Sequence, residues 1–411
     1  MSGGILMSNG LYQGKFFDYF GSIKDTRQEG KVWHKLIDIL FIVVSGIICG
    51  YDEWDMIHEW ASAPASQKWL NKYITLANGI PSLSTIKRGF GVLDSNEFST
   101  CFIEWMRDSL ELPDKDVVSL DGKTLRGSKD LTKETKALHM VSALCHSHGL
   151  VIGQTKTDEK SNEITAIPEL LDQLHIEGCI VTIDAMGLQK KIVKKIVNDN
   201  KAEYVINLKG NQGTLKQEVE DYFNALEQTG ELENIQRQPA QKLANLSDET
   251  NGIHVHSTLD KGHGRIEKRT YYYETDLSWM VDAKRDWEKL TGIGMVVREV
   301  GSMTNPDKKT KETAYYVSSV NNVIDFAKAA RSHWGVESMH WSMDVVFGDD
   351  RNQTRAGVAA QNLTIVKRMV FNTLKNETCI QPKKSKNKKR IVAATDPDYR
   401  DVLINLSFKE R

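Results

Sequence analysis

Apolar residues recur at helical spacing through the first quarter of the chain. The segment 34–50, HKLIDILFIVVSGIICG, has a wide apolar face and ends at Gly50, while 52–61 places Trp54, Ile57 and Trp60 on one helix face. These patterns predict a helical N-terminal domain over residues 1–112. The apolar run contains Asp38 and is shorter than the ~20 residues of a membrane span, so we expect a buried helix and no membrane segment.

One N-terminal segment has features of a DNA-reading element. In 79–94, GIPSLSTIKRGFGVLD, a turn at Pro81 and Ser82 leads into a short helix that carries Lys87 and Arg88. This arrangement is compatible with a helix-turn-helix that presents a basic helix to DNA. A capped surface helix of a bundle explains the same residues equally well.

From about residue 113 the pattern changes to short apolar strands that alternate with helices. The strands are expected in 117–122, 137–145, 150–157, 178–187 and 202–210, and the helices in 164–175 and 190–200. Such an order predicts a mixed α/β sheet of the RNase H-like kind over residues 113–375.

A β-rich insertion interrupts this order at about 215–320. It begins with a polar helix (215–228), and three alternating strands follow at 265–274, 291–300 and 313–320. Helices return from Val323 to about Leu374. We expect a basic C-terminal tail at 376–411, with the run KKSKNKKR (383–390) solvated and mobile.

Charge and cysteine content narrow the class of protein. The 54 basic and 55 acidic side chains leave a net charge of −1, which does not suit a protein that simply coats DNA but allows an enzyme with separate acidic and basic sites. The five cysteines form no CxxC pair, so we expect buried thiols in a reducing cytoplasm rather than zinc ligands or disulfides. The N-terminus has no secretory signal pattern.

Two carboxylates follow apolar strands. Asp121 ends VVSLD and Asp184 ends IVTID, and the carboxyl ends of strands are where open α/β sheets hold ligands. Mg²⁺ prefers oxygen ligands, and two such ions about 3.5–4 Å apart can activate an attacking oxygen and stabilise a leaving one. We therefore expect Asp121 and Asp184 to meet at a metal site, provided that their strands are neighbours.

A third acid is expected from the segment 330–350, ARSHWGVESMHWSMDVVFGDD. On a helix His333, Glu337, His340 and Asp344 share one face, beside Trp334 and Trp341. Burying these polar groups without partners would be costly, and a metal would resolve that cost. Zinc is the less favoured ion because the HExxH pattern is lacking.

Basic and amide side chains stand close to these acids in the sequence. Lys123 and Arg126 follow Asp121, while Lys209, Asn211 and Gln212 follow the strand at 202–208, and Arg265 lies in the insertion. Residues of these types suit DNA phosphates. Each one alone is more simply a solvated surface group, and only their repeated placement favours the functional interpretation.

Taken together, these motifs resemble the ISAs-type insertion-sequence transposases, also called H-repeat-associated proteins. The resemblance rests on DGKTLRGS, TIDAMGLQKKI, INLKGNQGTL, HGRIEKR and HWGVESMHWSMDVVFGDDRNQTRAGVAAQNL in this order, and it covers nearly the whole chain. It implies an RNase H-like catalytic domain whose Asp121, Asp184 and Glu337 hold two divalent metals. A Tyr, an Arg and a Lys surround the last Glu in the broader superfamily. Arg331 is near that Arg position, but His333 takes its place and Asp344 takes the place of the Lys.

The resemblance implies a DDE transposase that cleaves transposon ends and transfers the strands into target DNA, with two Mg²⁺ ions for which Mn²⁺ can substitute. It further implies double-stranded DNA as the partner, a homodimer on that DNA, and a bacterial, nucleoid-associated location in the cytoplasm. Two alternatives stay open: a metal-dependent nuclease without strand transfer, and an inactive DNA-binding relic. Asp344 stays an alternative to Glu337 as the third metal ligand.

Overall fold

The computed structural model describes residues 11–129, 136–157, 163–236, 252–262, 264–302, 309–355 and 357–406. The N-terminal part is helical, as predicted. Its helices are α1 (Lys15–Phe20), α2 (Leu36–Ile48), α3 (Trp54–Ser62), α4 (Pro64–Leu70), α5 (Leu83–Val92) and α6 (Ser95–Ser109). The apolar helix α2 is buried almost along its whole length, which confirms the prediction made for it. No helix in the described ranges is long and apolar enough to cross a membrane.

A nine-stranded mixed sheet forms the centre of the molecule, in the order β3-β2-β1-β4-β5-β9-β8-β7-β6. Its first five strands are β1 (Val117–Leu125), β2 (Leu138–Cys145), β3 (Leu150–Thr157), β4 (Ile180–Ile183) and β5 (Glu203–Leu208). β1, β2 and β3 are antiparallel neighbours, and β4 and β5 run parallel to β1. This half of the sheet has the RNase H-like arrangement that the sequence predicts.

The insertion continues the same sheet instead of forming a separate one. Its strands are β6 (Ile253–Gly262), β7 (Arg265–Glu274), β8 (Gly292–Ser302) and β9 (Lys309–Ser318), with helices α9 (Gly213–Gln228), α10 (Glu231–Gln236) and α12 (Val281–Asp286). β9 pairs antiparallel with β5, from Val205 opposite Ser318 to Leu208 opposite Tyr315. The three predicted strands are present, and the outermost strand β6 is an additional one.

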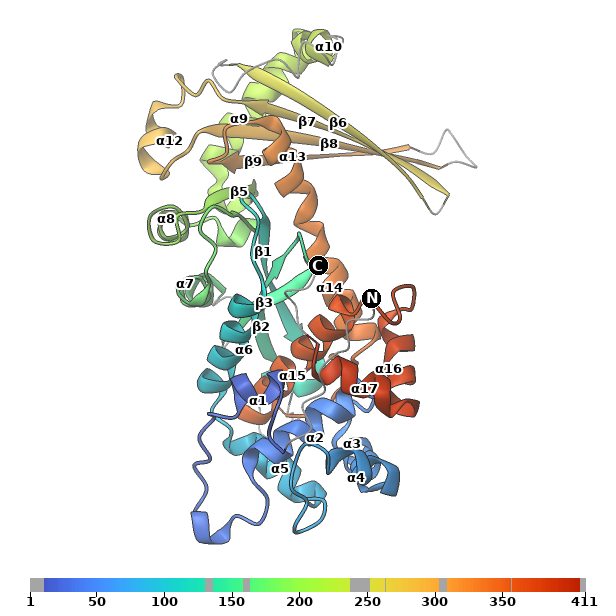
Figure 1. The fold of residues 1–411 in the computed structure, drawn as a ribbon. Helices are drawn as coiled ribbons and strands as arrows, with labels where there is room; N and C mark the ends of the chain where they lie inside the picture. The colour runs from blue at the N-terminus through green and yellow to red at the C-terminus, as the bar shows by residue number, and fades with distance from the viewer. Residues whose placement is uncertain are drawn as a thin grey trace.

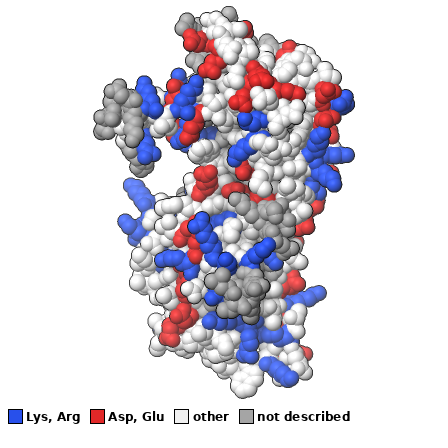
Figure 2. Space-filling view, turned by 180° about the vertical axis from the view of Figure 1, so that it is seen from behind, with Lys and Arg blue, Asp and Glu red and all other residues white. Residues whose placement is uncertain are grey.

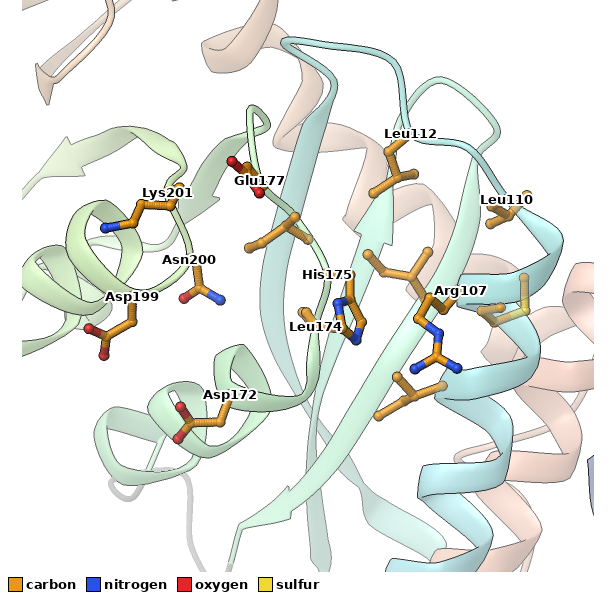
Figure 3. A pocket seen from close by; sticks show the side chains of 14 residues that line it. Arg107, Leu110, Leu112, Asp172, Leu174, His175, Glu177, Asp199, Asn200 and Lys201 are labelled. Atoms are coloured by element: carbon orange, nitrogen blue, oxygen red, sulfur yellow. The ribbon is translucent and has the colours of Figure 1, made fainter.

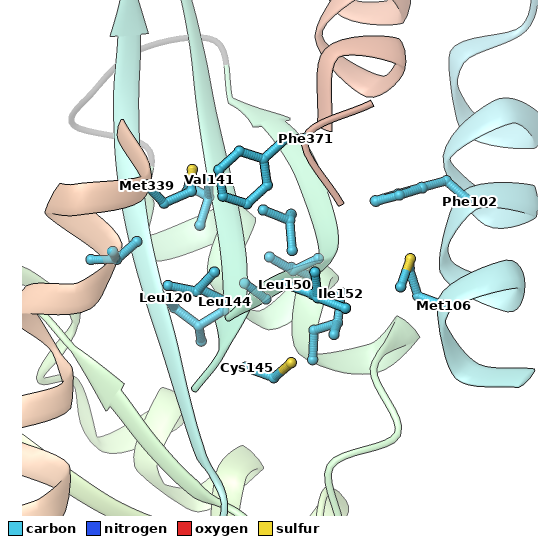
Figure 4. Packing of buried hydrophobic residues seen from close by; sticks show 14 of the residues in the cluster. Phe102, Met106, Leu120, Val141, Leu144, Cys145, Leu150, Ile152, Met339 and Phe371 are labelled. Carbon is cyan, nitrogen blue, oxygen red and sulfur yellow. The ribbon is translucent and has the colours of Figure 1, made fainter. Parts of the chain in front are cut away.

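Helices cover both faces of the first five strands (Figure 1). On one side lie α7 (Glu163–Gln173) and α8 (Lys190–Lys194), and on the other lie α13 (Val323–Ser332) and α14 (Trp334–Val345). Phe326 of α13 packs with Val117 of β1 and Ile180 of β4, whereas Leu120 of β1 shares the larger core. That core also receives side chains of α6, α14 and α15 (Val358–Asn376), which pack against β1–β3 (Figure 4).

The C-terminal residues fold back onto the N-terminal helices. They form α16 (Lys386–Thr395) and α17 (Pro397–Ile404). Arg390 is 2% exposed, donates from Nε to the Ile47 carbonyl at 3.0 Å, and lies 4.7 Å over the Phe347 ring. The prediction of a solvated and mobile basic run is therefore wrong for Lys389 and Arg390. Their long stems pack on apolar surface while their charged ends find buried acceptors.

The described cysteines have no disulfide partner. Cys49, Cys101, Cys145 and Cys179 are buried, as expected for small apolar side chains, whereas Cys379 is exposed.

Candidate active site

Asp121 and Asp184 lie at the same level of two neighbouring strands. β1 and β4 pair in parallel with Leu120 opposite Ile183, so the next residue of each strand is an aspartate. Asp184 directly follows β4, as predicted. Asp121 does not end its strand, because β1 continues to Leu125 through pairing with β2. The aspartates are thus adjacent, although only one of them stands at a strand end.

Helix α14 lies across this point of the sheet. Side chains alternate along a strand, so Asp121 and Lys123 project from the same face of β1. His340 places Nδ1 3.3 Å from the Asp121 carboxylate, and Lys123 forms an ion pair with Asp344 one turn further along the helix. The predicted shared face of α14 is therefore directed at β1.

His333 occupies the N-cap position of α14, near enough to the three carboxylates of the predicted triad for their charges to influence its imidazole. Its Nδ1 is 3.1 Å from the Thr182 hydroxyl on β4. Burial lowers the pKa of His333, and the negative charges of Asp121, Asp184 and Glu337 partly offset that shift. Asp344 is engaged with Lys123.

Lys209 approaches the site from the loop after β5. Its ammonium lies 2.8 Å from Asp184 Oδ1. Burial alone would raise the pKa of Asp184, but hydrogen bonds from Lys209 and from the Ala185 backbone N–H hold it below its ordinary value. Asp184 is therefore ionised at neutral pH, as a metal ligand must be.

Asn211 and Gln212 have a structural role in this loop. Asn211 donates to the Ala185 carbonyl at 2.6 Å, and Gln212 donates to the Leu188 carbonyl at 2.9 Å. Both amides tie the loop after β5 to the loop after β4. They position Lys209 beside Asp184, and each amide uses one of its two N–H donors for this backbone contact.

The chemistry of these acids, Asp121, Asp184 and Glu337 (the acid cluster), fits a hard divalent cation, although among the described residues their ligand atoms do not all lie within 4.8 Å of one another. Their carboxylate oxygens are the ligand type that Mg²⁺ and Mn²⁺ prefer. Two buried polar atoms on this face, His340 Nε2 and Asp344 Oδ1, have no hydrogen-bond partner among the described residues. Unsatisfied buried atoms are uncommon in proteins, and they are expected where an ion or its water completes a site.

A second cluster of possible ligands, Asp116, Cys145 and His148, is explained without a metal. Asp116 accepts hydrogen bonds from the backbone N–H groups of Val117 (2.8 Å) and Ser147 (3.0 Å), and its other oxygen accepts from the Ser147 hydroxyl. Burial raises the pKa of the Cys145 thiol to about 12, so this thiol is protonated at neutral pH. The Asp116 carboxylate therefore has a structural role, because it caps the turn at Ser147.

The remaining predicted DNA contacts lie outside the acid cluster. The Arg126 side chain is 84% exposed, with Nε 3.8 Å from Asp350, and Arg265 is exposed where β7 begins. Arg331 is half exposed on α13, with a nitrogen 3.9 Å from Asp260 of β6. It lines a hollow of about 290 Å³ that it shares with Trp334.

A hydrogen-bonded chain under the aspartates was not predicted from the sequence. Ser119 bonds the Thr182 hydroxyl at 2.7 Å and His146 Nε2 at 2.8 Å, and Thr182 continues the chain to His333. Gly335 leaves room for His146, because a Cβ there would lie 2.4 Å from that imidazole. The sequence did contain a signal for this chain: a hydroxyl residue, Ser119 or Thr182, stands two positions before each aspartate and so on the same face of the strand.

The cleft in Figure 3 lies at the other end of the sheet. Leu110 and Leu112 precede β1, and Glu177 precedes β4, so the cleft borders the ends at which these strands begin. Asp121 and Asp184 stand beyond the paired segments of the same strands. The cleft is therefore separate from the acid cluster.

Comparison with known proteins gives one consistent result. Residues 17–106 match the family model described as DDE_Tnp_1-associated, and residues 112–373 match the model described as Transposase DDE domain. The chain is 37% identical over 380 residues to "Putative transposase YncI" of Escherichia coli O157:H7, covering 92% of both chains. It is 36% identical over 388 residues to "H repeat-associated putative transposase YhhI" of Escherichia coli K12, covering 94% of this chain and 96% of the relative.

Among solved structures, a piggyBac transposase in a synaptic complex with hairpin DNA aligns with a TM-score of 0.42 at 10% identity. The alignment covers 96% of this chain and 82% of that one.

Proposed function

The chain belongs to the transposase family with a DDE domain, and from that membership we propose that it cleaves DNA at the ends of a mobile element and joins those ends to target DNA. The observation that carries the proposal is that Asp121 and Asp184 occupy adjacent positions of neighbouring strands, and that α14, which carries Glu337, lies against the same face of β1. Asp121 lies on β1, Asp184 directly follows β4 and Glu337 lies on α14, so regular elements carry or adjoin all three acids.

We assign Asp121, Asp184 and Glu337 as the ligands of divalent metal, with Mg²⁺ as the ordinary ion and Mn²⁺ as its substitute. When bound, the metal supplies activation of an attacking oxygen and stabilisation of a leaving oxygen in phosphoryl transfer. Asp344 is the less suitable third ligand, because it is already paired with Lys123. Its unpartnered Oδ1 can still accept a hydrogen bond from a metal-bound water.

The chain's own cations complete the site. Lys209 is 60% exposed beside Asp184, so its ammonium can reach a phosphate oxygen while it keeps that carboxylate ionised. His340 Nδ1 lies 3.3 Å from Asp121 Oδ2, where a protonated Nδ1 can donate to that carboxylate and orient it. Arg331, Arg126 and Arg265 lie outside the cluster, where they can contact the DNA backbone away from the cut.

Two tryptophans extend the site toward a nucleic acid. Trp334 is 41% exposed and Trp341 is 63% exposed, at the start and the middle of the helix that carries Glu337. An exposed indole offers an unpaired base a stacking surface, which is worth about 1–3 kcal/mol per base. We further propose double-stranded DNA as the substrate, two subunits on paired ends, and action in the bacterial cytoplasm at the nucleoid.

The proposal is tested with duplexes that carry the element end, in Mg²⁺ and in Mn²⁺. Asp121→Asn and Glu337→Gln are expected to abolish cleavage while duplex binding measured in EDTA is retained. Glu59→Gln, which alters a highly exposed acid on α3, serves as the matched control and should cleave normally. Cleavage by Asp121→Asn at the wild-type rate would refute the assignment.

The same assay separates the alternative functions. Pre-cut ends should be joined to a target plasmid by the wild-type chain if it is a transposase. Cleavage without joining would identify a nuclease, and binding without cleavage in either metal would identify an inactive relic. Loss of cleavage in Asp344→Asn but not in Glu337→Gln would transfer the third-ligand role to Asp344.

A further inference from the structure

Two buried hydroxyl groups lie beside the predicted metal ligands of the sheet. Ser119 of β1 and Thr182 of β4 are opposite each other in the parallel pairing, and their hydroxyl oxygens are 2.7 Å apart. Each stands two residues before an aspartate, so it projects from the same face of the sheet, about 6.6 Å along the strand from that aspartate. Ser119 is 0% exposed and Thr182 is 2% exposed, so neither hydroxyl can exchange its partner for bulk water.

A histidine stands at each end of this pair of hydroxyls. Ser119 Oγ lies 2.8 Å from Nε2 of His146, which directly follows β2, and Thr182 Oγ1 lies 3.1 Å from Nδ1 of His333. Among the described residues, no hydrogen bond involves Nε2 of His333. We call Ser119, Thr182 and His146 the relay, because they connect this imidazole to another one on the far side of two strands.

His146 is fixed in place and uncharged. Burial lowers its pKa to about 4, so its imidazole is neutral at pH 7. Gly335, in the first turn of α14, lies against the ring, because a Cβ at this position would be 2.4 Å from the imidazole Cε1. Glycine is unfavourable in a helix, and the space that His146 requires explains why one stands here.

The number of protons in the relay couples its two ends. Three hydrogen bonds join the four side chains, and each bond needs one proton. The two hydroxyls supply one proton each, since a hydroxyl has a single O–H donor. The third proton must come from an imidazole, either from Nε2–H of His146 or from Nδ1–H of His333. A neutral imidazole has one N–H only, so the direction of the hydrogen bonds decides which nitrogen of His333 is protonated.

The charges near His333 select one direction. Three negative charges and one positive charge act on its imidazole, those of Asp121, Asp184, Glu337 and Lys209. Nδ1 is engaged with Thr182, so Nε2 is the nitrogen that remains for a partner outside the relay. A net negative charge favours an N–H at Nε2 over a lone pair. The hydrogen bonds therefore run from Nε2–H of His146 through both hydroxyls to Nδ1 of His333.

We propose that the relay positions His333: it holds the imidazole in its Nε2–H form, so that Nε2–H donates a hydrogen bond to a phosphate oxygen at the acid cluster. The inference rests on the proposed function, since the phosphate is that of the proposed DNA substrate. A donor stabilises developing negative charge best when it is already oriented before the reaction. The relay supplies that orientation, and its residues touch neither the phosphate nor the metal.

The first test compares two variants of Thr182 that differ in the hydroxyl. Thr182→Val keeps the shape of the side chain and removes the hydroxyl, whereas Thr182→Ser keeps it. In Mg²⁺, cleavage of a duplex that carries the element end should have a kcat about 10- to 100-fold lower in Thr182→Val, with KM unchanged. Thr182→Ser should retain most of the wild-type rate. Equal rates of Thr182→Val and wild type would overturn the inference.

A double variant shows whether the relay acts through His333. His333→Gln alone should lower kcat by at least about 100-fold, because it removes the donor itself. Thr182→Val added to His333→Gln should cause no further loss, since the relay then has nothing to position. If Thr182→Val lowered kcat by the same factor in both backgrounds, the relay would have only a structural role and the inference would be refuted.

Duplex binding in EDTA is the control for the fold of each variant. Lys and Arg side chains, which bind DNA phosphates, lie on the surface, and many gather over the lower half of the face in Figure 2. The relay variants remove none of them, so a folded variant should bind the duplex as the wild type does. Ser142→Ala is the matched control for losing a buried hydroxyl. Ser142 lies opposite Asp121 on β2, is 0% exposed, and its hydroxyl has no partner among the described residues.

A spectroscopic measurement tests the relay without cleavage. Long-range proton–nitrogen correlation spectra of the full chain, labelled with nitrogen-15 histidine and kept in EDTA at pH 7, show which nitrogen of each imidazole is protonated. His333→Gln identifies the His333 signals by their loss. We expect the Nε2–H pattern at His333, and a shift of its Nδ1 signal in Thr182→Val and in Ser119→Ala but not in Ser142→Ala. An Nδ1–H pattern at His333, or an Nδ1 signal unchanged in both relay variants, would overturn the inference.

The two readouts separate the relay from the proposed catalysis. A chain that shows the expected His333 signals but never cleaves DNA would support the relay and refute the catalytic proposal. A chain that cleaves DNA at the wild-type rate after Thr182→Val would support the catalytic proposal and refute the relay.

Discussion

Replacing Gly122 by alanine is expected to destabilise the protein through a contact next to Asp121. Asp121 and Lys123 face α14, so the neighbouring Gly122 faces the other side of β1. A Cβ at Gly122 would lie 2.2 Å from the Glu163 carboxylate and 2.5 Å from His139 Nε2. Both side chains are buried and joined by a 2.7 Å hydrogen bond, so neither is free to move away.

The magnitude follows from two contributions. Overpacking a filled interior costs about 1–3 kcal/mol. Breaking a buried hydrogen bond between His139 and Glu163 costs about 1.5–3 kcal/mol more if the carboxylate is displaced. A total of about 2.5–6 kcal/mol corresponds to a fall of roughly 3–7 °C in melting temperature for 411 residues that unfold together, since unfolding entropy scales with chain length.

Differential scanning calorimetry at neutral pH measures this change. Gly91→Ala is the matched control, because no atom lies within 4 Å of its added methyl, and it should gain about 0.5–1 kcal/mol. In the double variant Gly122→Ala/Glu163→Ala the nearest clash is absent, so its cost should be smaller than the sum of the single costs. If Gly122→Ala melted like Gly91→Ala, or if the two changes at Gly122 and Glu163 were additive, the steric reasoning would be refuted.

Two further predictions concern buried charges. Asp349→Asn should lower the free energy of unfolding at pH 7 by about 3–5 kcal/mol, because it leaves the buried Lys367 and Arg368 without their carboxylate partner. An unchanged melting temperature would contradict this. Burial raises the pKa of Asp349, but the positive charges of Arg368 and Lys367 outweigh the effect of burial and hold the pKa below its ordinary value of 3.8. The stabilisation of the fold by the ionised carboxylate is therefore complete above pH 3.8 and is lost as the pH falls further. The difference between wild type and variant should therefore persist from pH 7 to about pH 4 and narrow only below it. Arg390→Met should lower the free energy of unfolding by about 3 kcal/mol, because it leaves the largely buried Asp52 carboxylate (19% exposed) without its ion-pair partner, and a melt equal to that of wild type would refute a stabilising role for this pair.

Much of the fold could be predicted because its elements have strong local patterns. The buried helix α2 and the strands β1–β5 follow from apolar runs and from the residues that end them. The edge strand β6 escaped prediction because its burial alternates weakly along a polar sequence, so neither face is clearly apolar. The C-terminal helices escaped because the burial of Arg390 depends on acceptors more than 300 residues earlier in the chain.

The site could be predicted as far as local sequence identifies an acid beside a strand or on a helix face. The sequence could not show that Asp121 stands within a longer strand, because that depends on pairing with β2. It could not show that Asn211 and Gln212 hold a loop, or that Ser119 and Thr182 link His146 to His333. These roles depend on contacts between elements that are distant in the sequence.

The central claim is that Asp121, Asp184 and Glu337 hold the divalent metal. The most direct test is a crystal of the full chain soaked in Mn²⁺, with the ions located by their anomalous scattering. The account predicts anomalous peaks in contact with the carboxylates of Asp121, Asp184 and Glu337 and no peak at Asp116, whose oxygens already cap a turn. A peak held by Asp116, Cys145 and His148 with none at the three acids would contradict it.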